Sequence, residues 1–300
     1  MNDIFEAHRE LLEGLAYRMC GVWADTEDIV QETHIRWCRA NHDRIENPRA
    51  WLVTVCTRLA LDKLRRVRRE AYIGPWLPEP LPGTPGHQAA LDDSISMALM
   101  VALERLSPVE RATFLLHDVF GYDFAGIATI LKRSEAACRK AASRARRAVR
   151  EARPRFSATA EEHRLLLGAF LEAVRGGDSS KLTALLAESV ELHADGGGRV
   201  PTAPDVLRGR EAVATFFLKV WQPDARVVEQ WFNGQPGVLI YQGETLRAAL
   251  CITPGPAGIE RIYAVRNPEK LGRFSPSPLQ HEWQTTYHSI STTDLHQGRI

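Results

Sequence analysis

A segment dense in proline and glycine, AYIGPWLPEPLPGTPGHQ at residues 71–88, divides this chain. Proline lacks an amide donor and clashes with the preceding helical turn, so no helix can continue through prolines that recur every two or three residues. The chain must therefore fold as separate domains on either side. A flexible tether would not carry the large apolar residues found here, namely Tyr72, Ile73, Trp76 and Leu77. We predict that this linker docks against the C-terminal domain or the first helical domain.

Charge is arranged in blocks, although the formal net charge of the whole chain is only +1. Residues 58–70 have a net charge of +4 and residues 132–155 a net charge of +8, whereas residues 1–57 have −4 and residues 71–131 have −5. Dense positive charge repels itself, so we interpret the positive blocks as separate contacts with a polyanion. The alternative is that both are solvated helix faces.

Composition gives no sign of a membrane or metal protein. Hydrophobic residues make up 44% and charged residues 25%, as in soluble globular proteins. No apolar run is long enough to span a bilayer, and the N-terminus lacks a secretory pattern, so we expect a cytoplasmic protein. We expect no metal or cofactor, because the cysteines form no metal-binding pair. They are expected to be buried thiols, namely Cys20, Cys38, Cys56, Cys138 and Cys251.

Residues 3–69 have the apolar periodicity of helices. One helix is predicted from Asp25 to about Arg39. Its polar surface is expected to bind another protein through Asp25, Asp28, Gln31 and Glu32. Exposed carboxylates on a helix keep ordinary pKa values, so this surface suggests no acid–base chemistry.

A second helix is predicted to start at Asn47-Pro48 and to end near Arg69, because Asn is a good N-cap and proline suits the first helical position. Its basic face would bind nucleic acid through Arg58, Arg65, Arg66 and Arg69, and a different face would be core, with Leu52, Val55, Cys56 and Leu59. Trp51 lies beside the polar face. It would either stack on an unpaired base or pack in the core.

Residues 106–150 have the lengths of a helix-turn-helix. Ser107-Pro108-Val109-Glu110 is a capping box, which predicts a helix from there to about Val119. Gly121 is predicted to interrupt the helix, and a short helix is predicted over 123–131.

The last helix of this motif is predicted to run from Ser134 to about Arg153 and to enter the major groove. Base edges and phosphates would be contacted by Arg133, Ser134, Glu135, Arg139, Lys140, Ser143, Arg144 and Arg147. Small residues would let the backbone approach the groove, namely Ala136, Ala137, Ala141 and Ala142. The alternative is an ordinary amphipathic helix pair with a basic face.

Beyond residue 157 the pattern predicts an α+β domain with a curved antiparallel sheet. Helices are expected at 160–175, 178–187 and 211–221, and strands at 226–232, 237–242, 245–253 and 258–266. Turns are expected at Asp195-Gly-Gly-Gly198, Asn233-Gly234 and Pro254-Gly255. The polar residues 275–300 are predicted to be a disordered tail.

Three motifs now allow a resemblance to be stated. DTEDIVQETHIRW at 25–37 resembles the helix with which sigma factors grip the polymerase clamp. NPRAWL at 47–52 resembles the segment that opens and reads the minus-ten promoter element, which implies that Asn47 contacts DNA together with Trp51. Residues 106–147 resemble the helix-turn-helix that reads the minus-thirty-five element. In this order, the motifs are similar to those of extracytoplasmic-function sigma factors.

Further motifs resemble a subgroup of that family with a C-terminal SnoaL-like (NTF2-like) domain. They are YIGPWLPEP at 72–80, DGGG at 195–198 and NPEKL at 267–271, with Arg199 where Lys is frequent and Glu269 where Asp is frequent. The resemblance implies regulation in cis, through contacts that involve Tyr72, Pro75, Trp76, Leu77, Asp195, Gly196, Gly197, Gly198, Asn267, Pro268, Lys270 and Leu271.

The resemblance implies a multidomain chain of two all-α sigma domains and an α+β NTF2-like cone. The expected boundaries are 1–70, a linker at 71–91, 92–156, 157–274 and the tail at 275–300. The implied partners are promoter DNA and RNA polymerase core, through the clamp of the β′ subunit and the β flap.

Two other function classes are weighed against the sigma factor. One is an independent helix-turn-helix regulator, which has no need of the acidic helix. The other is an NTF2-like isomerase or hydrolase with a DNA-binding appendage, whose cavity would use His193, Asp195, Tyr241 or Tyr263 and could hold an unidentified small ligand. Fold analogy alone does not establish catalysis, so we expect that this protein is not an enzyme.

Overall fold

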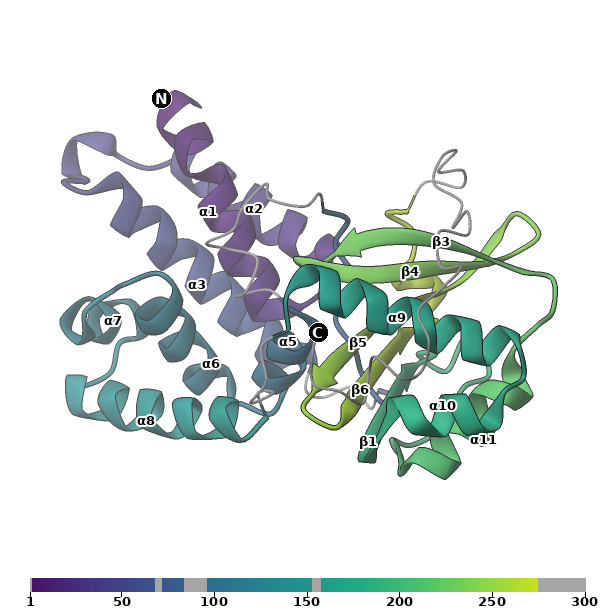
Figure 1. The fold of residues 1–300 in the computed structure, drawn as a ribbon. Coiled ribbons are helices and arrows are strands. Elements are labelled where there is room, and N and C mark those ends of the chain that lie inside the picture. Colours follow the sequence, from purple (N-terminus) through teal and green to yellow (C-terminus); the bar gives the residue numbers. More distant parts are fainter. Residues whose placement is uncertain (1, 68–71, 84–95, 153–157, 275–300) are drawn as a thin grey trace. The chain divides into compact units, whose positions relative to one another are not determined.

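The computed structural model describes residues 2–67, 72–83, 96–152 and 158–274. The chain divides into two compact units (Figure 1). The helical unit comprises Met1–Tyr72 and Ser94–Arg153, and the C-terminal unit comprises Ile73–Asp93 and Pro154–Ile300. The predicted tail at 275–300 and Arg69 lie outside the described residues. None of the described helices combines the length and the apolar character needed to cross a membrane.

The first part of the helical unit contains α1 (Asn2–Cys20), α2 (Trp23–Cys38), the short 3₁₀ helix η1 (His42–Arg44) and α3 (Pro48–Val67). The predicted N-cap is confirmed, because the Ala50 amide donates to the Asn47 side chain at 3.0 Å. Leu52 and Cys56 are fully buried, as expected. Val55 and Leu59 are only half-buried, and the neighbouring face, with Val53 and Ala60, is in the core instead.

The second part contains α5 (Met97–Glu104), α6 (Pro108–Phe114), the π-helical turn η2 (Leu115–Val119), α7 (Phe124–Leu131) and α8 (Glu135–Ala152). The capping box forms as predicted, with the Glu110 amide and the Ser107 hydroxyl bonded at 3.4 Å and the Ser107 amide donating to the Glu110 carboxylate at 3.0 Å. Gly121 has a φ of 73°, which glycine adopts without strain. The helix-turn-helix geometry is therefore present.

The C-terminal unit contains α9 (Ala160–Arg175), α10 (Ser179–Leu185), β1 (Leu186–Asp195), β2 (Leu207–Arg208), α11 (Arg210–Val220), β3 (Ala225–Phe232), β4 (Gln235–Gln242), β5 (Thr245–Gly255), β6 (Gly258–Val265) and the 3₁₀ helix η3 (Pro268–Lys270). The strands form one sheet in the order β2-β1-β6-β5-β4-β3. The α+β class is confirmed, and the tight turn at Asn233-Gly234 is present, both residues having positive φ.

Two expectations about this sheet are wrong. The sheet is mixed, because β1 pairs with β6 in parallel. The chain leaves β1 for β2, α11 and the β3–β5 meander before it returns, so no tight hairpin forces antiparallel pairing. In addition, β5 continues through Pro254 and Gly255, and the turn lies at residues 256–257.

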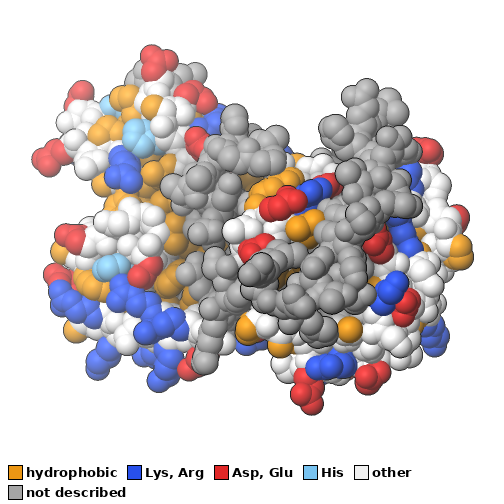
Figure 2. Space-filling model, viewed as in Figure 1, with side chains coloured by type: hydrophobic (Ala, Val, Ile, Leu, Met, Phe, Trp, Pro, Cys, Tyr) orange, Lys and Arg blue, Asp and Glu red, His pale blue; other side chains and the backbone are white. Residues whose placement is uncertain are grey.

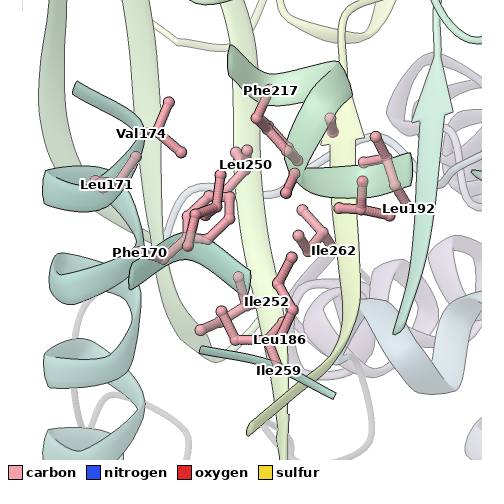
Figure 3. Packing of buried hydrophobic residues seen from close by; sticks show 14 of the residues in the cluster. Phe170, Leu171, Val174, Leu186, Leu192, Phe217, Leu250, Ile252, Ile259 and Ile262 are labelled. Atoms are coloured by element: carbon pink, nitrogen blue, oxygen red, sulfur yellow. The ribbon is translucent and has the colours of Figure 1, made fainter. Parts of the chain in front are cut away.

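One face of the sheet packs against the helices (Figure 3). Phe170, Leu171 and Val174 of α9 and Phe217 of α11 meet Leu250 and other alternate residues of the strands. This packing follows the period of two in the strands, which places Leu250 and Ile252 on the same face. The residues between them in each strand face away from this core.

Candidate nucleic-acid interface and linker contacts

The exposed face of α8 is basic. Buried residues form one stripe along α8 and exposed residues form the opposite stripe. Blue atoms of Lys and Arg gather over this helix in Figure 2. The predicted contact residues in this region are all exposed, namely Arg133, Ser134, Glu135, Arg139, Lys140, Ser143, Arg144 and Arg147. The Ser134 hydroxyl accepts from the Ala137 amide at 3.2 Å and so caps the helix.

The alanines of α8 do not all face outward as expected. Ala141 and Ala142 are 2% and 0% exposed and share the buried stripe with Cys138. Only Ala136 is exposed. The helical period puts residues 138, 141, 142, 145 and 149 on one face, so small size here serves close packing inside the domain.

Ion pairs divide the basic residues of α8 into two groups. Arg144 lies 2.6 Å from Glu110 of α6, and Arg139 lies 2.7 Å from Glu135. Burial pushes the pKa of Glu110 up, but hydrogen bonds from Ser107 and Arg144 outweigh it and hold this pKa below its usual value. Within the described part of the chain, Lys140 and Arg147 make no ion pair, so their charge is available to an external anion.

The basic residues of α3 are not equivalent. Arg58 is half-buried and donates to the backbone carbonyls of Ile130 at 2.9 Å and Thr129 at 3.2 Å, at the end of α7. Arg65 and Arg66 are exposed and bond locally to Asp62. In this structure Arg58 therefore joins α3 to α7. Among the predicted contact residues of α3 that the structure describes, Arg65 and Arg66 present an open basic surface.

Trp51 packs against another aromatic side chain. Its ring centroid lies 5.5 Å from that of Trp37, which is 2% exposed. Trp51 itself is half-buried. The packing alternative therefore describes its position here, while its exposed part remains beside the polar face of α3.

The polar residues of α2 differ in the same way. Asp28 and Gln31 are exposed, and Glu32 pairs with Arg36 at 2.8 Å. Asp25 lies 2.5 Å from Lys63 of α3, and this hydrogen bond is the main reason why the pKa of Lys63 is raised. Asp25 thus holds two helices together, and the open part of this surface is carried by Asp28 and Gln31.

The linker is tied to the C-terminal unit by a buried ion pair. The carboxylate of Asp195, at the end of β1, accepts from the Leu77 amide at 2.8 Å and from the Lys270 ammonium at 2.7 Å. Lys270 also donates to the Leu77 carbonyl at 2.6 Å, and its Nζ lies 4.4 Å from the centre of the Trp76 ring. Asp195 and Lys270 are 0% and 5% exposed. Each polar atom is therefore desolvated and depends on its partners.

Nearby residues of the signature motifs shape this site. Gly197 and Gly198 have φ values of 59° and 69°, and a Cβ on Gly196 would lie 2.5 Å from the Val200 carbonyl. Asn267 caps η3, whose Pro268 is exposed, and Leu271 is buried. Arg199 pairs with Glu269 at 2.8 Å. Pro75 is half-buried, whereas Tyr72 is exposed and belongs to the helical unit.

A second linker contact was missed from the sequence. The Leu81 amide donates to the Asn233 side chain at 2.9 Å, and the Asn233 amide donates to the Leu81 carbonyl at 3.0 Å. Gly83 donates to the carbonyl of Trp231 at 3.0 Å. The sequence of Asn233-Gly234 predicts a hairpin turn, and nothing in that dipeptide indicates that the Asn233 side chain binds a segment 152 positions away.

The four candidate catalytic residues do not line one cavity. His193 bonds to Glu191 at 3.0 Å and lies 5.5 Å from the ring of Tyr263, whose pKa is raised by burial. A cavity of about 460 Å³ in this unit is lined by Tyr241 but not by His193, Asp195 or Tyr263. In the described ranges, no group of His, Cys, Asp and Glu side chains could hold a metal ion.

Comparisons with known proteins agree with the geometry. Residues 4–70 match Sigma-70 region 2, and residues 96–149 match Sigma-70, region 4. The chain is 38% identical to the ECF RNA polymerase sigma factor SigJ of Mycobacterium tuberculosis, over 92% of this chain and 94% of that protein. It is 34% identical to the probable ECF RNA polymerase sigma factor SigI of the same organism, over 89% and 93%. A crystal structure of SigJ matches with a TM-score of 0.73 and 35% identity, covering 93% of this chain and 100% of that one. The chain therefore belongs to the family of extracytoplasmic-function RNA polymerase sigma factors.

Proposed function

We propose that α8 reads the minus-thirty-five promoter element and that the basic end of α3 contacts DNA near the minus-ten element. The first assignment rests on an exposed row of basic residues in the helix-turn-helix, namely Arg133, Lys140 and Arg147. These three side chains make no ion pair with any residue that the structure describes. Bare positive charge on a recognition helix favours phosphate binding. For α3, the support is the exposure of Arg65 and Arg66.

The polymerase contact is assigned to α2. Asp28 and Gln31 are exposed one turn apart and take no part in the helix packing, which suits a surface for the β′ clamp. The second helical domain would bind the β flap. Promoter DNA and polymerase core are thus held by different faces of the helical unit.

The C-terminal unit would regulate the sigma domains in cis by holding the linker that joins them. The support is the buried Asp195–Lys270 pair, which fixes the backbone of Leu77 from both sides. A linker held in this way limits the arrangements open to the two DNA-reading domains. A signal that released it would shift the population of arrangements.

Run-off transcription with purified core polymerase tests the promoter assignment. The double variant Lys140→Ala/Arg147→Ala should lose about tenfold or more in promoter binding, because each phosphate contact contributes to affinity. Arg175→Ala is the matched control, since Arg175 is exposed at the end of α9 in the other unit. Equal transcription by the double variant and the control would contradict the assignment.

The polymerase assignment has a separate test. Asp28→Lys/Gln31→Lys should weaken co-purification with core polymerase but leave the fold intact, because both side chains are exposed. Glu161→Lys on α9 is the control. Unchanged binding of core by the double variant would exclude this face of α2.

A further inference from the structure

The cavity in the C-terminal unit has mostly apolar walls. It has a volume of about 460 Å³ and lies between the end of α11 and the strands β4, β5 and β6. Phe217 and Leu250, which Figure 3 shows in the core, form part of its wall, together with Phe216 and Trp221. This size is within the range of small-molecule sites.

None of the residues that the structure describes neutralises the positive charge on this cavity. Arg247 and Arg266 are both lining residues, and the described lining contains no Asp or Glu. Arg266 donates to the Pro201 carbonyl at 2.5 Å, but neither arginine makes an ion pair with any residue that the structure describes. The pKa of Arg266 is lowered by burial and, secondly, by the charge of Arg247, so the two guanidinium groups repel each other.

We propose that this cavity binds an organic anion with an apolar body, whose acidic head group lies between Arg247 and Arg266. An anion there would relieve the repulsion between the two guanidinium groups and accept charge-assisted hydrogen bonds. The body would lie against Phe216, Phe217 and Trp221, which offer aromatic contact area. The remaining polar residues of the lining are Tyr241, Gln222 and Gln242, and none of the three carries a charge that would oppose an anion.

Two fluorescent probes of similar aromatic body test this site on the full chain. Anilinonaphthalene sulfonate has an anionic head, and phenylnaphthylamine is its neutral counterpart. We expect saturable binding of the sulfonate at one site per chain. Arg247→Gln and Arg266→Gln should each weaken it about tenfold, the value of one charge-assisted hydrogen bond, and should leave the neutral probe unchanged.

Matched variants make the result decisive. Arg247 is exposed, so its substitution does not disturb packing, and Arg266→Lys keeps the charge if Arg266→Gln fails to fold. Arg175→Gln is the charge control, and Ala225→Phe, at a half-buried lining position, should reduce binding of both probes.

Several results would overturn the proposal. They are equal affinity for the two probes, sulfonate binding that survives both arginine substitutions, and binding that is indifferent to Ala225→Phe. The assay contains neither DNA nor polymerase, so its failure is distinct from a failure of the promoter and polymerase assignments.

Discussion

Replacing Lys270 by methionine should strongly destabilise the C-terminal unit. The change removes the ammonium group from Asp195, which is 0% exposed and keeps the backbone amide of Leu77 as a hydrogen-bond donor. A buried carboxylate that loses its counter-charge costs about 3–5 kcal/mol of folding free energy. The Leu77 carbonyl and the face of Trp76 lose their cationic partner in the same step.

Urea denaturation of the full chain, followed by circular dichroism, measures this loss as a lower transition midpoint. Limited trypsin digestion should show faster cleavage of Lys270→Met in the folded chain. Lys181→Met is the control, because its pair with Asp178 is exposed and spans 3.6 Å, and such pairs contribute about 0–1 kcal/mol.

A double variant separates the pair from its parts. Asp195→Asn/Lys270→Met removes both charges and keeps an acceptor for the Leu77 amide, so it should be more stable than Lys270→Met alone. If the free energy of unfolding of Lys270→Met lies within about 1 kcal/mol of that of the unmodified protein, the reasoning from desolvated charge is refuted.

The remaining predictions concern three other residues. Asn233→Gly keeps the positive φ and the backbone bond to the Leu81 carbonyl but loses the side-chain acceptor of the Leu81 amide. It should therefore cost about 1 kcal/mol and speed proteolysis of the linker, and an unchanged cleavage rate would contradict this contact. Gly196→Ala should lower the urea midpoint, because its Cβ would lie 2.5 Å from the Val200 carbonyl, whereas Gly272→Ala, with open space around it, should not. Burial lowers the pKa of His163 to about 4, so the folded state takes up a proton less readily than the unfolded state. The free energy of unfolding should therefore fall by up to about 3 kcal/mol as the pH drops from about 6.5 towards 4. His163→Gln should flatten that part of the pH dependence, and an unchanged slope would exclude His163 as its source.

Local signals in the sequence were sufficient for the helical unit. The capping box at Ser107, the N-cap at Asn47 and the break at Gly121 each depend on neighbours within one turn, and each appears as predicted. The face of α8 that packs inward was misjudged at Ala141 and Ala142, because small residues suit both a groove and a tight core.

Long-range pairings could not be read from local pattern. The parallel pairing of β1 with β6 depends on where the chain returns after a long excursion, and no local periodicity encodes that. The bonds of Arg58 to Thr129 and Ile130, and of Asn233 to Leu81, join segments more than 70 positions apart. The linker motif indicated contacts, but only the fold identified Asp195 and Lys270 as one ion pair.

The linker also covers part of an edge. β3 is the last strand of the sheet, and Leu81, Pro82 and Gly83 pair with its end at Trp231–Asn233. Pro80 and Pro82 have no amide hydrogen, so the segment can cap this edge without offering a continuous ladder to another chain. A chain whose linker came loose would bare unpaired peptide groups there, so activation by release would carry a risk of self-association through strand addition.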